Sequence, residues 1–364
     1  MREWTSPYNP FNSLKVLMWR NELEAIAREE YLPPVTVDTD PTNTCNYNCV
    51  WCNAFDYMKK NVNALSEEHL LKLADFYKEW GVKSTCVAGG GEPLLNKGLT
   101  AFLERLDKNG VESGIITNGS VMTDESTEAI ARWSRWCGFS MDAATPETYA
   151  KLKGINDNKF FNKVVENLGS LVKRRDKLGS RLDIAFKFLM HPENAHEIYD
   201  AAKLAKSLGV NDFHMRPVGW DNLTVTKGKP GLDFEPLIKK IEKQVEAARS
   251  LESSTFHFYG VTHKFGTRLE RKINFKRCWA PPLLATFGAD GKCHLCFDMR
   301  GREDLVLCSH YPEPREILKV WGSEFHRNLI KNIDPHECPR CTFGPYNEIV
   351  EQVIVQDKMC RFFP

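Results

Sequence analysis

The sequence lacks the long apolar runs and the strong net charge that mark several classes of protein. No stretch approaches the roughly 18 consecutive apolar residues of a membrane span. The opening residues, MREWTSPYNPF, have neither the basic start nor the apolar run of a signal peptide. A formal net charge of +1 over 364 residues gives no overall basic field of the kind that nucleic-acid binders use. We therefore expect a cytoplasmic globular protein without a membrane partner, and the charge argues against a nucleic-acid partner.

Cysteine, in contrast, is plentiful. The chain has 12 cysteines, and disulfides rarely persist in the cytoplasm. We therefore interpret the cysteines as metal ligands, catalytic thiols and core residues. Cys86 and Cys137 lie inside strand-like runs and are interpreted as core residues.

Strand-like and helix-like runs alternate over more than half of the chain. Helix-like runs such as 66–80 and 196–209 separate six strand-like runs, at 35–40, 83–89, 112–119, 136–142, 181–191 and 211–218. Six strand–helix units in series predict an α/β protein whose parallel sheet curls into a partial (β/α)6 barrel of the TIM type. In such barrels the loops after the strands surround one mouth, where reactive groups gather.

The pattern divides the chain into four parts. Residues 1–35 form a lead-in with one amphipathic helix, and residues 36–220 form the barrel. A polar linker and a helix occupy 221–272, where the alternation stops. We expect a small, cysteine-rich second domain over 273–364.

The stretch CNYNCVWC, residues 45–52, has three closely spaced cysteines and no fourth. Three thiolates can hold three corners of a four-iron four-sulfur cluster and leave one iron open to another ligand. The spacing alone leaves a second possibility, a zinc site completed by a distant histidine, although no histidine lies within a dozen residues.

With its context, this loop resembles the radical S-adenosylmethionine (radical SAM) superfamily. Cys45, Cys49, Trp51 and Cys52 match the signature C-x3-C-x-aromatic-C, and GGGEPLL at 89–95 matches the Gly-Gly-Glu-Pro segment after the second strand. The resemblance implies a [4Fe-4S] cluster whose open iron binds SAM. It further implies reductive cleavage of SAM to methionine and a 5′-deoxyadenosyl radical that abstracts hydrogen from a substrate. An external reductant such as flavodoxin or ferredoxin would supply the electron.

Under this resemblance, residues at the predicted strand ends are candidates to bind SAM. Consecutive glycines allow close approach of the backbone to its methionine end. Polar side chains could hold its ribose or amino-acid group, although each could equally cap the following helix. Two cationic residues could pair with the SAM carboxylate, with substrate, or with surface carboxylates. The expected cofactor-binding residues are Trp51, Gly89, Gly90, Gly91, Glu92, Asn118, Ser140, Asp142, Lys187 and Arg216.

The C-terminal cysteines allow two interpretations. Two C-x2-C pairs, 293–296 and 338–341, are spaced as in a zinc ribbon. The order of Cys278, Gly291, Cys296 and the later CPRC instead resembles the SPASM or twitch extension of radical SAM enzymes, which we favour. That resemblance implies one auxiliary [4Fe-4S] cluster. Its expected ligands are Cys278, Cys296, Cys338 and Cys341.

The tail also departs from the complete SPASM pattern. No cysteine follows Cys341 until Cys360, so we do not expect a second auxiliary cluster. Cys360 could ligate the auxiliary cluster or be a free thiol, and Cys293 is equally open. Cys308 and Cys360 are candidate catalytic thiols that would donate hydrogen to a substrate radical.

The expected reaction follows from the auxiliary cluster. A cluster with four thiolate ligands has no open iron, so we expect it to accept an electron and the reaction to be an oxidation. Peptide-modifying relatives often begin with a recognition domain for which this chain has no room, so we expect a small polar substrate: a sugar, cyclitol, nucleoside or amino-acid derivative. Epimerisation, decarboxylation and peptide maturation are alternatives, and a zinc-ribbon binding module is a remote one.

Overall fold

One ten-stranded sheet organises the molecule. A computed structural model describes residues 10–52, 54–60, 62–218, 232, 234–260, 273–338 and 341–355. The strand order is β10-β9-β8-β1-β2-β3-β4-β5-β6-β7. The strands are β1 (Thr36–Thr39), β2 (Ser84–Val87), β3 (Glu112–Thr117), β4 (Trp136–Ser140), β5 (Asp183–Met190), β6 (Asp212–Pro217), β7 (His257–Gly260), β8 (Leu284–Phe287), β9 (Lys292–His294) and β10 (Val306–Ser309).

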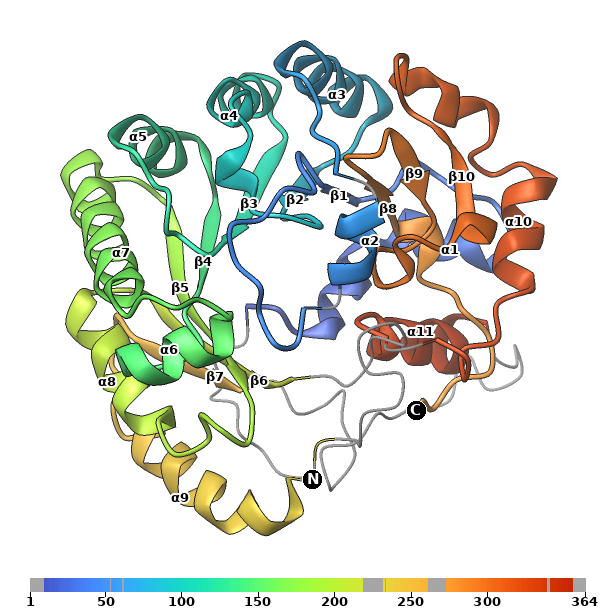
Figure 1. The fold of residues 1–364 in the computed structure, drawn as a ribbon. Helices are drawn as coiled ribbons and strands as arrows, with labels where there is room; N and C mark the ends of the chain where they lie inside the picture. Colours follow the sequence, from blue (N-terminus) through green and yellow to red (C-terminus); the bar gives the residue numbers. More distant parts are fainter. Residues whose placement is uncertain are drawn as a thin grey trace.

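Helices cover the outer side of this sheet. Figure 1 shows the strands as an arc, with α3, α4, α5, α7 and α8 outside it. We call the opposite side the concave face. The helices are α1 (Arg20–Ala27), α2 (Phe55–Lys60), α3 (Glu67–Trp80), α4 (Leu99–Lys108), α5 (Asp124–Trp133), α6 (Pro146–Lys153), α7 (Lys159–Leu178), α8 (Ile198–Leu208), α9 (Ile238–Arg249), α10 (Glu324–Lys331) and α11 (Gly344–Ile349).

The predicted α/β fold with a parallel sheet is confirmed. β1 to β6 coincide with the six predicted strands, and each pairs in parallel with the next. A seventh parallel strand, β7, follows α9 and pairs with β6. The sequence analysis described 221–272 only as a linker and a helix, and it missed this strand. β7 has only four residues, so its pairing with β6 decides its conformation more than any pattern in the sequence.

The C-terminal strands extend the same sheet from its other edge. β8 pairs in parallel with β1, and β9 and β10 add antiparallel neighbours beyond it. The cysteine-rich segment is therefore joined to the barrel through backbone hydrogen bonds next to β1. In Figure 1 these orange and red elements lie beside the blue ones from the start of the chain.

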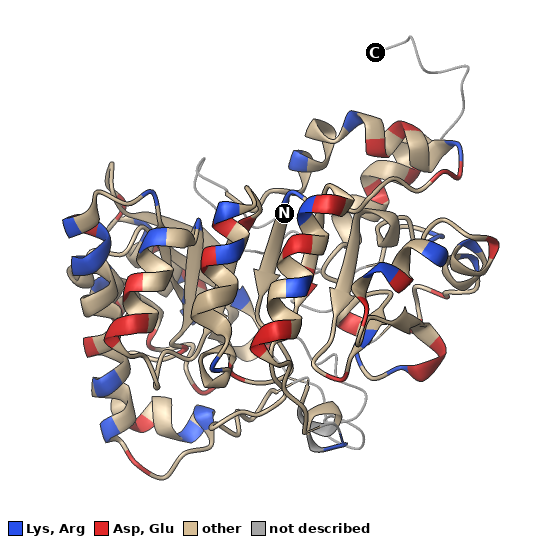
Figure 2. Ribbon diagram, turned by 90° about the horizontal axis from the view of Figure 1, so that it is seen from above, with Lys and Arg blue, Asp and Glu red and all other residues tan. Residues whose placement is uncertain are grey.

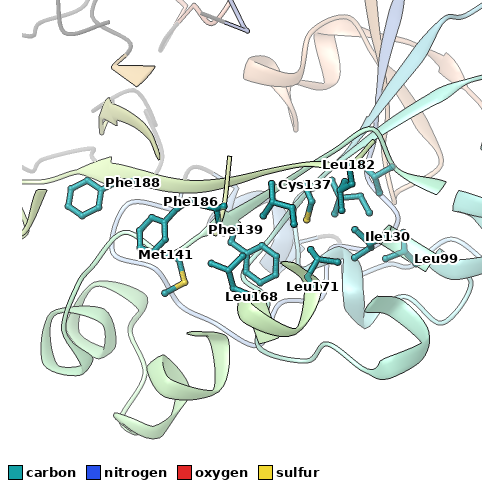
Figure 3. Close-up of a cluster of buried hydrophobic side chains, with 14 of the residues drawn as sticks. Leu99, Ile130, Cys137, Phe139, Met141, Leu168, Leu171, Leu182, Phe186 and Phe188 are labelled. Atoms are coloured by element: carbon teal, nitrogen blue, oxygen red, sulfur yellow. The ribbon is translucent and has the colours of Figure 1, made fainter. Parts of the chain in front are cut away.

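The core lies between the sheet and its outer helices. Phe139 and Phe186 on β4 and β5 pack against Leu168 and Leu171 of α7, and all four are fully buried. Figure 3 shows this layer, in which Cys137 also lies. Cys137 is fully buried, in agreement with its interpretation as a core residue.

Local signals fix the ends of several outer helices. Ser66 caps α3 by accepting from His69 N, and Gly81, with φ of 92°, ends it. Thr123 and Ser126 form a capping box at the start of α5. Figure 2 shows acidic and basic residues interspersed along these helices.

The lead-in segment packs against the C-terminal part of the chain. A second hydrophobic cluster joins Val16, Leu23 and Ile26 to Trp279 and Val350. The two ends of the described chain therefore share this cluster. Among the described residues, no helix is both long enough and apolar enough to cross a lipid bilayer.

Candidate functional site

The three-cysteine loop follows β1 at the C-terminal edge of the parallel sheet. Cys45, Cys49 and Cys52 are partly buried, and Cys52 N donates to Cys49 O at 3.0 Å. Burial raises the pKa of Cys45 to about 11. Burial also raises the pKa of Cys49, and the nearby Lys153 ammonium opposes this effect. Three thiols on one turn, beside a cation, are a donor set that suits an anionic iron–sulfur cluster.

Helix α6 holds this loop from one side. Asn48 N and Val50 N donate to the carbonyl oxygens of Lys153 and Leu152, each at 3.0 Å. Gly154 follows with φ of +62°, and a Cβ there would overlap the carbonyl oxygen of Asn48. Glycine is therefore required where the end of α6 meets the cysteine loop.

The glycine run holds the loop from the other side. Gly91 N donates to Thr42 O at 3.0 Å, and Glu92 N donates to Thr44 O at 2.9 Å. A Cβ at Gly91 would overlap Thr44 O, and one at Gly90 would overlap the Asn43 side chain. Gly89 has φ of +131°. These glycines thus let the backbone approach the segment that leads into Cys45, and their expected approach to SAM stays a prediction.

Glu92 ties β2 to β3. Its carboxylate is buried and accepts from Thr117 Oγ1 at 2.5 Å, Asn118 N at 2.7 Å and Leu94 N at 3.1 Å. Burial raises its pKa to about 7, against these hydrogen bonds. The Asn118 amide in turn donates to Asn46 Oδ1 at 2.9 Å. Glu92 and Asn118 thus form a network that supports the cysteine loop.

Asp142 is paired with a lysine that the sequence analysis missed. Lys153 Nζ lies 2.5 Å from Asp142 Oδ2, and Asp142 Oδ1 accepts from Leu189 N at 2.6 Å. The ammonium lies 5.8 Å from the ring centroid of Trp51, the aromatic residue of the cysteine motif. In the sequence Lys153 resembles an ordinary cation at a helix C-terminus. Its spacing of four from Tyr149, whose ring it also faces at 5.6 Å, was the available signal.

Ser140, Lys187 and Arg216 lie together on the concave face. Ser140 is the register partner of Lys187, and Lys187 is the partner of His214, two residues before Arg216. Strand side chains alternate between faces, so these share one. Burial, and next the charge of Arg216, lower the pKa of Lys187 to about 8.

Cys86 also lies on the concave face, which corrects its interpretation as a core residue. It is partly exposed and is the register partner of Asp38 on β1. Burial raises the pKa of Asp38 to about 7, although the Arg300 guanidinium opposes the rise. Alternating exposure along β1 and β2 places Val37 and Thr85 on the other face. The apolar neighbours of Cys86 in sequence suggested burial, but they belong to that other face.

The four expected auxiliary ligands lie on three segments of the chain, around Cys278, around Cys296 and at Cys338 and Cys341. Cys278 and Cys296 are partly buried. Burial is the main cause that raises the pKa of both thiols, and Cys341 adds to the rise in both. Cys338 also raises the pKa of Cys278. Such coupling requires proximity. In the described part of the chain, no group of three or more His, Cys, Asp or Glu side chains is arranged to hold a metal ion.

Two polar contacts bring those segments together. Asn347 donates to Cys341 Sγ at 3.6 Å, while its Oδ1 accepts from Trp279 N at 2.6 Å. Asp298, two residues after Cys296, accepts from Thr342 N at 2.7 Å. A four-thiol donor set of this kind suits a cluster without an open iron.

The remaining cysteines are not brought to either group. Cys308 on β10 is the cross-strand partner of the buried Cys293 on β9. Cys293 is also the register partner of Phe287, whose ring packs against Tyr77 of α3 at 5.2 Å between centroids. Cys293 and Cys308 therefore belong to the helix-covered side of the sheet, away from the concave face. Cys360 lies outside the described residues.

Comparison with known sequences gives one family. The family described as the radical SAM superfamily matches residues 39–241, which is more than half of the chain. A probable GTP 3′,8-cyclase of Saccharolobus islandicus is 26% identical over 210 residues, which cover 56% of this chain and 65% of that protein. GTP 3′,8-cyclase 2 of Pseudomonas aeruginosa is 32% identical over 113 residues, 30% of this chain and 34% of that protein. The chain thus spans less than two thirds of these relatives.

Solved structures share the fold over more of the chain. Streptococcus suis SuiB bound to S-adenosylmethionine has a TM-score of 0.65 and 14% identity, covering 98% of this chain and 84% of SuiB. Native anSMEcpe with bound AdoMet has a TM-score of 0.56 and 15% identity, covering 85% of this chain and 87% of that one. At these identities the likeness concerns the fold alone.

Proposed function

Since the chain belongs to the radical SAM superfamily, we propose that it oxidises a small polar substrate by a radical reaction that S-adenosylmethionine initiates. Cys45, Cys49 and Cys52 would hold the catalytic [4Fe-4S] cluster. When bound, that cluster and SAM supply a 5′-deoxyadenosyl radical, which abstracts a hydrogen atom from the substrate. The contacts of α6 and of the glycine run with the cysteine loop orient these three thiols.

The observation that supports the oxidative assignment is the set of polar contacts that join the segments carrying Cys278, Cys296 and Cys341. Four thiolates would leave an auxiliary cluster without an open iron, so its use would be to accept an electron. The segment after Cys296 also reaches the barrel. Arg300 Nε lies 2.5 Å from Asp40 Oδ2, and the two side chains are 10% and 0% exposed. This buried ion pair fixes the auxiliary segment against the loop that follows β1.

An oxidation also needs a proton acceptor, and Asp38 is suited to that role. A carboxyl with a pKa of about 7 can accept a proton near neutral pH. It lies on the concave face, and the charges that act on it most strongly are Arg300, Asp40 and Asp298. Asp38 would take the proton of a substrate hydroxyl or amine after hydrogen abstraction, and the remaining electron would leave to the iron–sulfur acceptor.

A second candidate follows from the sequence relatives. Two of them are named GTP 3′,8-cyclases, so a cyclisation of a nucleotide deserves a direct test. SAM-dependent conversion of added GTP to a cyclised product would favour this candidate. Epimerisation, decarboxylation and peptide maturation are further possible reactions, and product analysis separates them.

The testing experiment uses anaerobically purified protein and three variants. We would measure iron, sulfide and zinc, and 5′-deoxyadenosine formed from SAM with dithionite, for the wild type, Cys45/Cys49/Cys52→Ala, Cys338/Cys341→Ala and, as control, Cys308→Ser. Two four-iron clusters would give about eight irons per chain in the wild type and the control, and about four in each cluster variant. Only the first variant should lose SAM cleavage.

Two results would count against the proposal. Four irons and one zinc in the wild type would remove the electron acceptor and favour a redox-neutral reaction. SAM cleavage that persists without Cys45, Cys49 and Cys52 would remove the catalytic assignment itself.

A further inference from the structure

Hydrogen-bond donors gather on the concave face around Trp136 and Lys187. The Lys187 ammonium lies 5.2 Å from the centroid of the Trp136 ring. The Trp136 indole Nε1 is buried and has no hydrogen-bond partner within the described structure. In the same described residues, Lys187 forms no side-chain hydrogen bond or ion pair, and its ammonium faces the Trp136 ring. Ammonium and indole N–H groups can only donate, so the ligand that would satisfy both is an acceptor.

Two glycines make room for this arrangement. A Cβ at Gly138 would lie 2.6 Å from Trp136 Cη2 and 2.7 Å from Lys187 Cδ. A Cβ at Gly114 would lie 3.3 Å from Trp136 Cε3. The indole therefore lies across Gly114 of β3 and Gly138 of β4, the two positions that carry no side chain. The aliphatic part of the Lys187 side chain crosses β4 at Gly138. Neither arrangement would be possible with a side chain at 138.

The charge around this cluster is positive. Arg216 follows His214, the register partner of Lys187, on the same face of β6. The two cations repel each other: burial first, and Arg216 next, lower the pKa of Lys187 to about 8, while Cys86 and Asp142 act weakly the other way.

We infer that Lys187, Trp136 and Arg216 form a binding site for an oxyanion, a phosphate or carboxylate group of the substrate. This inference rests on the proposed function and narrows its substrate class to small molecules that carry such a group. Arg216 and Lys187 supply charge, and the indole N–H supplies a directional donor. The site lies on the same concave face as Asp38, so a substrate held here by its anionic end can direct a hydroxyl or amine toward Asp38.

The SAM carboxylate has the same chemistry, so the experiment must separate the two sources. Inorganic phosphate is the probe, and the reconstituted holoenzyme is the protein. The first measurement is the thermal unfolding midpoint as phosphate replaces chloride at constant ionic strength. The variants are Lys187→Met, Lys187→Arg and Trp136→Phe. Lys163→Met is the control, since it removes one exposed positive charge on α7.

Phosphate should raise the midpoint of the wild type and of the Lys163→Met control. In Lys187→Met the apparent phosphate affinity should fall roughly tenfold or more, the effect of losing one charge-assisted hydrogen bond. Lys187→Arg keeps the positive charge and should retain most of the phosphate affinity. Trp136→Phe keeps an aromatic side chain but loses the N–H together with the five-membered ring, so it should weaken phosphate binding. Equal stabilisation of Lys187→Met and the wild type would overturn the inference.

The second measurement is SAM binding to the same proteins. If phosphate does not compete with SAM and Lys187→Met binds SAM as the wild type does, the oxyanion belongs to the substrate. Competition, together with weaker SAM binding in Lys187→Met, would assign the site to the SAM carboxylate and overturn the substrate assignment. Failure of the proposed function would appear separately, as missing iron or missing 5′-deoxyadenosine.

Discussion

Lys153 and Asp142 form a buried ion pair next to the cysteine loop. Their side chains are 2% and 1% exposed, and Nζ lies 2.5 Å from Oδ2. Burial lowers the pKa of Lys153, but the Asp142 carboxylate and Cys49 raise it more, so the net pKa is raised and the lysine stays charged. Asp142 has φ of +61°, which is uncommon for a residue other than glycine. The pair therefore fixes a cation near Cys49, 5.8 Å from the centroid of the Trp51 ring.

Breaking this pair from one side should be costly. Lys153→Met leaves the Asp142 carboxylate buried without its partner, and we expect a loss of about 3–5 kcal/mol in the free energy of unfolding. The double variant Lys153→Met/Asp142→Asn leaves no unpaired charge and should recover part of that loss. Chemical denaturation of the four proteins gives the coupling energy. Additive effects would mean that the two side chains do not interact.

Gly154 should be far more sensitive to alanine than a similar glycine elsewhere. Gly154 and Gly179 both end helices with positive φ, but only at Gly154 would a Cβ meet the cysteine loop. Gly179→Ala should cost about 1–2 kcal/mol, the price of the left-handed backbone alone. Gly154→Ala should cost more and also lower the iron content of the reconstituted protein. Equal iron in both variants would contradict the role of α6 in holding the loop.

Asp38→Asn should stabilise the protein above neutral pH. The folded state raises the pKa of Asp38 from 3.8 to about 7, so the carboxyl favours folding only while protonated. Its contribution is full below about pH 4 and is lost as pH rises through 7. At pH 8 the free energy of unfolding of the variant should therefore exceed that of the wild type by about 2 kcal/mol, a value reduced for partial exposure. Near pH 4 the two proteins should differ little. Denaturation at both pH values measures this, and an equal effect at both would refute it.

The same variant should separate hydrogen abstraction from oxidation. If Asp38 accepts the substrate proton, Asp38→Asn should still produce 5′-deoxyadenosine from SAM, but the yield of oxidised product per 5′-deoxyadenosine should fall by about 10² or more. Cys86→Ser, which changes its register partner on the concave face, is the matched control. An unchanged yield of oxidised product per 5′-deoxyadenosine in Asp38→Asn would mean that another group accepts the substrate proton.

His310 should make the protein sensitive to mild acid. Its Nδ1 lies 2.9 Å from His69 Nε2, and its Nε2 lies 2.9 Å from Gly288 O. Burial lowers the pKa of His310 from 6.5 to about 4. Between these pH values the His310 side chain is protonated in the unfolded chain but neutral in the folded protein. The free energy of unfolding should therefore fall as pH decreases from 6.5 toward 4. His310→Gln should flatten this part of the stability profile, and an unchanged slope would contradict the assignment.

The sequence by itself determined the parallel fold and the first cysteine group. Cys45, Cys49, Trp51 and Cys52 lie within eight residues, so their spacing is a local property that needs no knowledge of the fold. The strands β1 to β6 could also be predicted from the sequence, because alternating strand and helix patterns repeat along the chain. The four C-terminal thiols were selected by their pattern, and their role as ligands of one cluster stays a prediction.

Only the tertiary structure decided which side chains share a face and which distant segments meet. Cys86 lies in a strand-like run and Lys153 resembles an ordinary cation at a helix end, yet one lies on the concave face and the other is buried in an ion pair with Asp142. The pairing of β8 with β1 joins residues about 250 apart in the chain, and β7 is a strand because β6 lies beside it. Such outcomes depend on contacts between residues far apart in sequence, whose free energy no local pattern records.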